Sequence, residues 1–259
     1  MTGTTPDRRR PEILAGVSLA GVTTFVVAVL ALHVIQRRQS PVAVTISEYV
    51  LGAAGWLFPV ACVGLGVASL ALAALLRATR PVSSRIGLVL LTAWAVGMFL
   101  VAIFPTDPID RHAKVVHLSP AGLVHAIAGQ IAFVCFGVAA PLITRSLRRH
   151  GWAGPVMGAA RISAVASVAG LAFALTVTAL GLFSLFGLAE RVMLPAYTAW
   201  LTLTILYARA HPQPRSPRPD NGAGHRHHPD QLDQANPTTA QPRVGSRPAS
   251  SSGQQINLD

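Results

Sequence analysis

Residues 104–129, FPTDPIDRHAKVVHLSPAGLVHAIAG, form a polar connection between two long apolar segments of the chain. The connection holds two Asp, three His, one Arg and one Lys. The apolar segments on either side are about twenty residues long, the length of an α-helix that crosses the hydrocarbon core of a bilayer. This arrangement predicts two membrane-spanning helices joined by a loop. The ionisable residues of the loop are the first candidates for a functional site.

The composition of the whole chain is that of a membrane protein. Its 259 residues are 51% hydrophobic and only 12% charged, with a mean hydropathy of +0.49. Soluble domains carry about a quarter charged residues. Apolar runs alternate with short connections that contain arginine, a pattern typical of helical membrane proteins that cross the bilayer several times. We therefore predict an all-α, polytopic membrane helical bundle.

Six apolar runs predict six transmembrane helices. We place them at residues 13–35, 53–76, 86–104, 120–144, 160–186 and 192–207. The first run is longer than the core of a signal peptide, roughly 7–15 residues, so we expect it to be retained. Ser119 followed by Pro120 is a hydroxyl N-cap with proline at the first helical position, which marks the start of the fourth helix. Gly16, Ala20 and Thr24 recur at intervals of four and predict a smooth face for close helix packing.

Polar segments flank the helices at both ends of the chain. Residues 1–12 form a short lead with three consecutive arginines, and residues 13–207 make up the six-helix transmembrane domain. Residues 208–259 are rich in Pro, Ser, Gln, Asn, Gly, Arg and His, and they contain too few apolar side chains to bury a core. We expect a disordered tail there. The HRHH at residues 225–228 is interpreted as an unstructured basic patch within that tail.

The distribution of basic residues predicts the orientation of the helices. Eleven Lys and Arg residues lie near the helix ends on the side of the two termini, against five on the opposite side. The positive-inside rule then places both the lead and the tail in the cytoplasm, with the protein crossing the cell membrane of a bacterium six times. The acidic residues of the connections all fall on the outer side: Glu48, Asp107, Asp110 and Glu190.

The formal net charge of +11 does not indicate a nucleic-acid-binding protein. The arginines lie at the ends of apolar runs rather than on an amphipathic face, so we expect them to set topology and to contact anionic lipid headgroups. Membrane lipids are the expected partners, and protein partners are left open. Cys62 and Cys135 lie inside apolar runs, which favours buried hydrophobic roles over a disulfide or metal motif. The sequence contains no Gly-rich phosphate loop, GxSxG elbow or haem-spaced His pair.

His125 and Asp107 are the most informative ionisable residues. His125 lies roughly 8 Å into the predicted fourth helix, where an ionisable group is a functional candidate by default; the alternative is a neutral imidazole hydrogen-bonded to a neighbouring helix. Asp107, before Pro108, is expected to cap a short helical turn, a role compatible with a place in a site. Asp107, His117 and His125 offer ligands for a zinc-type centre, although their spacing matches no established metal motif. The charges at 110–114 are expected to form a solvated loop face.

Two glutamates complete the set of candidates. Glu48 precedes the second helix and Glu190 precedes the sixth. We take Glu48, Asp107 and His125 as the catalytic candidates. For Glu190 we expect a structural ion pair, either locally with Arg191 or between helices with the opposite loop, because ionic groups near membrane depth usually pair.

Four stretches of the chain carry a family resemblance: ISEYVLGAAGWLFP at 46–59, FPTDP at 104–108, AGLVHAIAG at 121–129 and GLAERV at 187–192. Together they resemble the domain of unknown function 998 family, which comprises bacterial and archaeal integral membrane proteins. The resemblance covers residues 13–207 and leaves out the tail. It implies an integral membrane protein in which Glu48, Asp107 and His125 belong to the motifs of the family. It implies no established activity.

The sequence leaves three functions open, and with them the question of whether the protein is an enzyme. The first is a non-enzymatic membrane protein that binds lipid or uses its outer polar cluster to fix helix packing. The second is a membrane-embedded, metal-dependent lipid hydrolase with a divalent metal on Asp107, His117 and His125. In that case Glu48 serves as general base. The third is a small transporter with Glu48, His125 and Glu190 as relay groups.

Overall fold

Long runs of Ala, Leu, Val and Gly form the helices of this protein, whose computed structural model describes residues 9–79, 84–109 and 117–211. Within these residues there are six long α-helices, two short 3₁₀ helices and no strand. They are α1 (Arg9–Ile35), η1 (Ser47–Leu51), α2 (Leu57–Thr79), α3 (Arg85–Ile103), α4 (Pro120–Arg149), α5 (Pro155–Ala179), η2 (Phe183–Leu185) and α6 (Phe186–Ala210). The predicted all-α class is confirmed.

Five of the helices, α1 to α5, are long and apolar enough to cross a membrane. Helix α6 is 25 residues long and is interrupted by Thr, Tyr and Arg residues, and it is not among these candidate spans. Five apolar helices of this length indicate a multi-pass membrane protein. A sixth span through α6, and the direction in which the helices cross, stay predictions.

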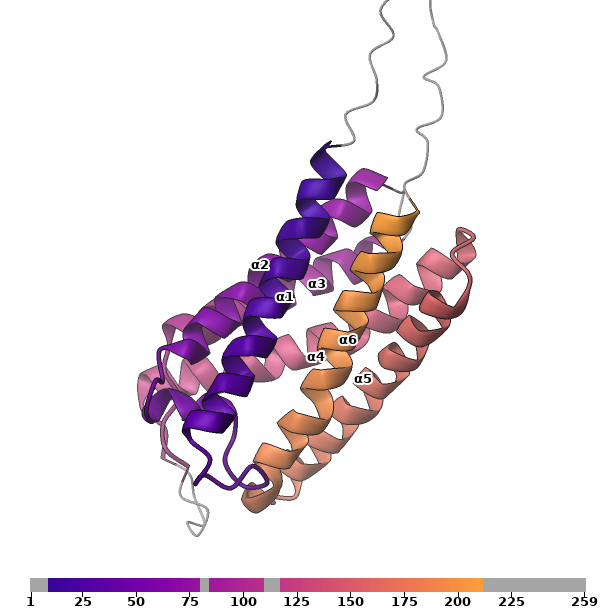
Figure 1. Cartoon of the computed structure of the whole chain (residues 1–259). Helices are drawn as coiled ribbons and strands as arrows, with labels where there is room; N and C mark the ends of the chain where they lie inside the picture. The colour runs from indigo at the N-terminus through magenta and orange to yellow at the C-terminus, as the bar shows by residue number, and fades with distance from the viewer. Residues whose placement is uncertain (1–8, 80–83, 110–116, 212–259) are drawn as a thin grey trace, which may run out of the picture. The chain divides into compact units, whose positions relative to one another are not determined.

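The helices pack in the order in which they occur in the chain. Each packs against the next, and α6 closes the arrangement by packing against α1 (Figure 1). Helix α6 also contacts α2 and α4. Figure 1 shows the start of α1 and the end of α6 at the same end of the bundle. Because neighbouring helices alternate in direction, the connections after α1, α3 and α5 fall together at the other end.

Aromatic side chains from α3, α4 and α6 fill the centre of the bundle. Phe136 stacks on Tyr197 with 4.2 Å between ring centroids, and Trp94 and Trp200 meet Phe136 edge-on at 5.0 and 5.5 Å. The buried indole N–H of Trp200 donates to the Thr144 hydroxyl at 2.8 Å. Aromatic pairs in these geometries stabilise a core beyond the area that they bury.

Helices α1 and α2 approach closely at a pair of glycines. A Cβ added at Gly21 would collide with the carbonyl oxygen of Gly64. A Cβ added at Gly64 would lie 3.0 Å from the carbonyl oxygen of Gly21. Of the predicted packing face of α1, Thr24 lies beside Gly64 of α2, although Gly16, Ala20 and Thr24 are all exposed. Small residues occur on several faces of this helix, so spacing alone does not identify the face that meets α2.

The connection between α5 and α6 also differs from the prediction. Helix α5 ends at Ala179. Two residues later, Gly181 adopts a left-handed conformation with φ of +63°. The Leu182 N–H then donates to the Val177 carbonyl at 3.0 Å, which is a common way for a helix to end. The residues at 187–192, expected to form a turn and the start of a helix, therefore all belong to the first turns of α6.

Several predicted features lie outside the described residues. They are the disordered tail from residue 212, including its HRHH patch, and the solvated charges at 110–114. At the edges of the described chain, α1 begins at Arg9 and α6 continues to Ala210. Both helices are longer than the apolar runs that predicted them.

Candidate functional site

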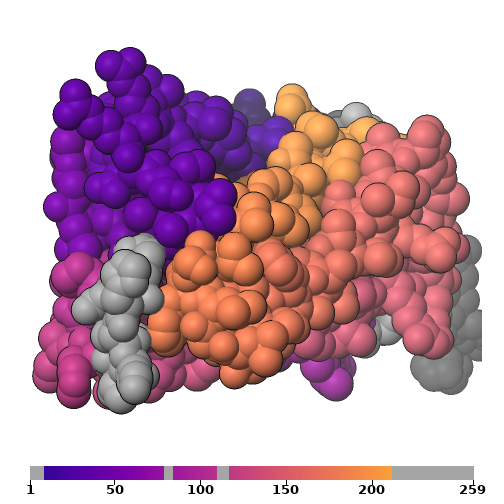
Figure 2. All heavy atoms as spheres, turned by 90° about the horizontal axis from the view of Figure 1, so that it is seen from below, coloured from indigo at the N-terminus to yellow at the C-terminus, as the bar shows by residue number. Residues whose placement is uncertain are grey.

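Polar side chains from segments far apart in the sequence meet at one end of the bundle. Figure 2 looks at this end and shows the connection after α1, in indigo, directly beside the start of α6, in orange. The end of α3 and the start of α4 also contribute. We call the residues that join these segments the polar network: His33, Gln36, Glu48, Tyr49, Asp107, Ser119, His125, Glu190 and Arg191.

Glu48 connects the first outer loop to the segment after α3. The side chain is only 8% exposed. Its Oε2 accepts hydrogen bonds from the backbone N–H and the hydroxyl of Thr45, at 2.9 and 3.0 Å. Its Oε1 accepts from the Ile109 N–H at 3.2 Å. Both oxygens hold backbone in place, so the geometry gives Glu48 a structural task. Its catalytic role stays a prediction.

Asp107 caps the start of α4 from a distance of twelve residues along the chain. Its two carboxylate oxygens accept from the backbone N–H and the hydroxyl of Ser119, at 2.6 and 2.9 Å. The Ser119 hydroxyl in turn accepts from the Gly122 N–H at 3.1 Å, as predicted for an N-cap. The short helical turn that Asp107 was expected to cap would continue into residues 110–116, which lie outside the described residues. In the described part of the chain, the carboxylate adds negative charge at the positive end of a long helix.

His125 joins α4 to the end of α3. The ring is buried, and its Nδ1 donates to the carbonyl oxygen of Phe104 at 2.7 Å. Phe104 is the C-cap of α3, so the bond satisfies a carbonyl that the helix leaves without a partner. In a neutral ring with its proton on Nδ1, Nε2 is an acceptor. The bond to a neighbouring helix is the contact expected under the second of the two alternatives for His125, and the neutral state stays a prediction.

Arg191 makes the largest set of hydrogen bonds in the polar network. Its guanidinium donates to the carbonyls of Val44 and Gly187, at 2.7 and 3.0 Å. It also donates to the Tyr49 hydroxyl at 2.8 Å and to Nε2 of His33 at 2.9 Å. The guanidinium lies 5.4 Å from the centre of the Tyr49 ring, within the range of a cation–π contact. Sequence reasoning did not predict these contacts. The sequence shows only that an arginine lies near the start of a helix, and it does not show which distant groups the guanidinium bonds.

His33 joins α1 to α6 through both nitrogens of its ring. Nδ1 donates to the Val29 carbonyl one turn earlier in α1, at 2.7 Å. Nε2 accepts from the guanidinium of Arg191 at 2.9 Å. The edge of the ring also contacts Tyr49, with 5.1 Å between ring centroids.

Glu190 and Gln36 tie the same loop to α6 and α1. Oε2 of Glu190 accepts from the Ile46 N–H. The amide of Gln36 donates to the carbonyls of Tyr49 and Ala53, at 2.7 and 2.9 Å. A direct ion pair between Glu190 and its neighbour in sequence stays a prediction. What these contacts establish is that the loop after α1 is held against two helices.

A cavity of about 250 Å³ lies beneath the polar network, between the helices. Apolar side chains from α1, α2, α3, α4 and α6 make up much of its wall: Phe25, Phe58, Met98, Phe133 and Met193. Polar groups line it as well: Thr45, Ser47, His125, Gln130 and Glu190. Ligand sites in proteins have this character, with mostly apolar walls and a few placed polar groups.

The metal candidates do not come together. Among the described residues, no group of three or more His, Cys, Asp or Glu side chains is placed to hold a metal ion. Asp107 lies near His125, but its carboxylate oxygens bond Ser119 and the ring of His125 bonds the Phe104 carbonyl. His117 is exposed. The hydrolase hypothesis was motivated by a metal site on these three residues, and the described part of the chain does not form that site.

Residues 19–207 match the family model described as a protein of unknown function, DUF998, and this match covers more than half of the chain. The protein belongs to the DUF998 family. No curated protein and no solved structure matches it.

In this DUF998 protein, the four stretches that carried the family resemblance meet in the polar network. Residues 46–59 supply Glu48 and Tyr49, and residues 104–108 supply Asp107 and the carbonyl that bonds His125. Residues 187–192 supply Glu190 and Arg191. These stretches of the chain thus build one end of the bundle and cover the cavity beneath it.

Proposed function

We propose that this DUF998 protein binds a lipid-like, amphipathic molecule in the cavity beneath the polar network. The observation that supports the proposal is the cavity itself, which combines apolar walls with the ionisable side chains of His125 and Glu190. Its volume of about 250 Å³ lies just below the range for small-molecule sites, about 300–1,000 Å³. A single apolar chain or a small ring system suits a space of this size.

The polar groups of the cavity indicate the chemistry of the ligand headgroup. Nε2 of His125 is an acceptor, because Nδ1 is used as a donor to Phe104. Glu190 uses Oε2 for the Ile46 N–H, which leaves Oε1 to accept another bond. Two acceptors favour a ligand that donates, such as one with a hydroxyl or amino group. The wall that carries these groups is already fixed by the polar network, so little ordering is needed on binding.

Filling the cavity is expected to abolish retention of the ligand. Gly129 lines the cavity, and a Cβ added there meets only Val101 Cγ2 at 3.7 Å, so Gly129→Leu extends into open space. Purified wild-type protein is expected to retain close to one equivalent of an amphiphile through size-exclusion chromatography, measured by mass spectrometry of the extracted lipid. Gly129→Leu is expected to retain less than a tenth of that amount, because the space is filled.

Gly16→Leu is the matched control, because nothing lies within 4 Å of a Cβ at Gly16 and the residue does not line the cavity. It makes the same chemical change on an exposed part of α1 and is expected to retain the amphiphile. Equal retention by both variants, or no retained amphiphile in the wild type, would show that the cavity is not a binding site.

For the topology, we propose six spans with both ends of the helical domain in the cytoplasm of the cell. Basic residues gather at one set of helix ends and acidic residues at the other, which supports this orientation. Helix α6 has 25 residues and at about 1.5 Å per residue is roughly 37 Å long, enough to cross a bilayer.

Cysteine labelling in intact cells tests the orientation. In a background with Cys62 and Cys135 replaced by alanine, Ser40→Cys is expected to react with a membrane-impermeant thiol reagent from outside. Arg85→Cys, at the start of α3, is expected to react only after the cells are permeabilised. Both positions are exposed. The reverse pattern, or labelling of both in intact cells, would contradict the proposed orientation.

A further inference from the structure

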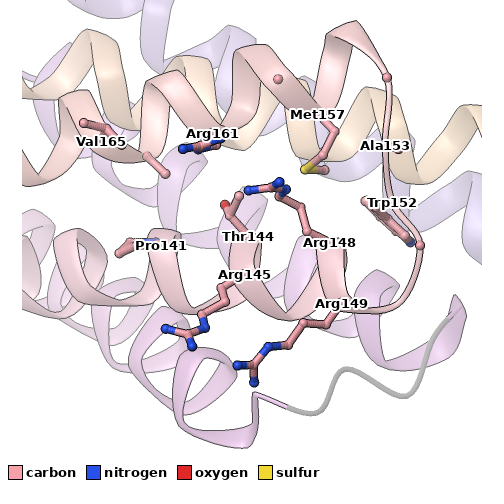
Figure 3. Close-up of a pocket in the computed structure, with 14 residues that line it drawn as sticks. Pro141, Thr144, Arg145, Arg148, Arg149, Trp152, Ala153, Met157, Arg161 and Val165 are labelled. Carbon is pink, nitrogen blue, oxygen red and sulfur yellow. The ribbon is translucent and has the colours of Figure 1, made fainter. Parts of the chain in front are cut away.

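A second cavity opens between the end of α4 and the start of α5, at the opposite end of these helices from the polar network (Figure 3). Its volume is about 840 Å³, within the range of small-molecule sites, about 300–1,000 Å³. Of the fourteen described residues that line it, none is acidic and four are arginines: Arg145, Arg148, Arg149 and Arg161. We call this cavity the arginine cleft. A lining of this kind attracts an anion.

The arginines reach the cleft from both helices. Figure 3 shows Arg148 of α4 and Arg161 of α5 extending into the gap between the two helices, while Arg145 and Arg149 extend from the other side of α4. Like charges directed into one gap repel each other, and an anion bound between them removes that cost. Guanidinium groups donate pairs of hydrogen bonds whose geometry matches the oxygens of a phosphate.

The start of α5 directs the positive end of a helix dipole toward the same cleft. Gly154 is the N-cap of α5, Pro155 after it has no N–H, and the Gly158 N–H donates to the Gly154 carbonyl at 2.9 Å. The helix dipole and the remaining N–H groups of the first turn favour anions. Gly154, Met157 and Gly158 all line the cleft. The helix start and the arginines thus favour the same kind of ligand.

The turn that closes the cleft is held in place by α6. Trp152 is buried and stacks on Tyr207 with 4.4 Å between ring centroids. The Tyr207 hydroxyl accepts from the Ala153 N–H at 3.1 Å. Gly151 and Gly154 have φ angles of +84° and +97°, which side chains rarely adopt. The wall of the cleft is therefore formed before any ligand arrives, which limits the entropic cost of binding.

The position of the cleft decides between a lipid and a free anion. Helices α4 and α5 are both candidate membrane spans, and the cleft lies at their ends, where lipid headgroups are found. About one turn further along these helices, apolar residues continue the lining away from the arginines: Pro141, Ala164 and Val165. We propose that the arginine cleft binds the phosphate-bearing headgroup of an anionic phospholipid, with an acyl chain along this apolar strip.

Binding of defined lipids to the full-length protein in neutral detergent tests the proposal. The probes are diphosphatidylglycerol, phosphatidylcholine and inorganic phosphate, and the measurement is native mass spectrometry or a thermophoretic titration. Diphosphatidylglycerol is expected to bind in preference to the other two. The double variant Arg148→Gln/Arg161→Gln is expected to weaken that binding at least about tenfold, because charge-assisted hydrogen bonds to the phosphate are lost.

The double variant Arg77→Gln/Arg209→Gln is the matched control. It removes the same charge at exposed helix ends outside the cleft and is expected to change the affinity less than about twofold, the size of a general charge effect. An equal loss in both double variants would overturn the proposal, because it would show only non-specific attraction. Equal binding of phosphatidylcholine would do the same. Saturable binding of inorganic phosphate that depends on Arg148 and Arg161 would identify a free-anion site instead of a lipid site.

A charge-conserving variant separates binding from folding. Arg148→Lys/Arg161→Lys keeps the charge of the cleft but loses the paired donors. It is expected to give affinity between those of the wild type and the glutamine variant. Gly129→Leu, which alters the cavity under the polar network, is expected to leave binding in the arginine cleft unchanged. Binding in the cavity and binding in the arginine cleft are thus tested independently of each other.

Discussion

Replacing Arg191 with methionine is expected to lower the free energy of unfolding by about 4 kcal/mol, because one substitution removes every bond of the guanidinium at once. The carbonyl of Val44 and the hydroxyl of Tyr49 lose their donor, and Nε2 of His33 loses its partner. Methionine keeps much of the side-chain volume, so the loss reports the hydrogen bonds and the charge rather than an empty space. The start of α6 is then no longer bonded to the loop after α1.

Thermal unfolding of the purified protein in detergent measures this effect. A loss of this size is expected to lower the melting temperature by roughly 10 °C, given about 2–4 °C per kcal/mol for a protein of this length. Arg191→Lys keeps the charge without the fork of donors and is expected to give an intermediate value. Arg209→Met, at the exposed end of α6, is the control and is expected to melt with the wild type. An Arg191→Met protein that melts with the wild type would show that these bonds add nothing to stability.

Replacing Gly21 with valine is expected to cost about 3 kcal/mol, because the new side chain would collide with the backbone of α2. The obstacle is the carbonyl oxygen of Gly64, which belongs to a helix and cannot rotate away. Ala68 closes the same contact from the next turn of α2. Helices α1 and α2 would have to separate, and the Ser18 hydroxyl bond to the Ala68 carbonyl, now 2.6 Å, would lengthen.

Gly16→Val is the matched control for this prediction. It makes the same substitution in the same helix, so the change in helix propensity is the same, but no atom lies within 4 Å of the added Cβ. It is expected to change the free energy of unfolding by less than about 0.5 kcal/mol. Unfolding by titration with a denaturing detergent measures both variants. Equal stability of the two would mean that α1 and α2 do not meet through Gly21.

The helices of this protein could be predicted because their signals are local. An apolar run of about twenty residues must form a helix if it enters a bilayer, since no other open structure satisfies its backbone. Ser119 and Pro120 fixed the start of α4 for the same reason, because the cap acts within one turn. Gly181 was overlooked as a helix end because it lies in an apolar stretch, where nothing else signalled a break.

The polar network could be predicted only in part. Glu48, Asp107, His125 and Glu190 were recognisable as ionisable residues in or near the connections between apolar runs, but their partners lie far away in the chain. Arg191 bonds His33 across 158 residues, and Asp107 bonds Ser119 across twelve. No local pattern specifies such pairs, because they depend on which helices become neighbours. The same limit explains why Asp107, His117 and His125 suggested a metal site that the described residues do not form.

The first loop of this protein depends on partners that the ribosome makes much later. Val44, Ile46 and Tyr49 are bonded to Glu190 and Arg191 across 142 to 147 residues. At about 5–20 residues per second, synthesis of that stretch takes roughly 7–30 s. During this time the loop has the bonds from Gln36 and Ile109 but lacks those from α6. A chain that stops before α6 keeps the loop incompletely bonded, so the integrity of that loop reports whether α6 has been synthesised.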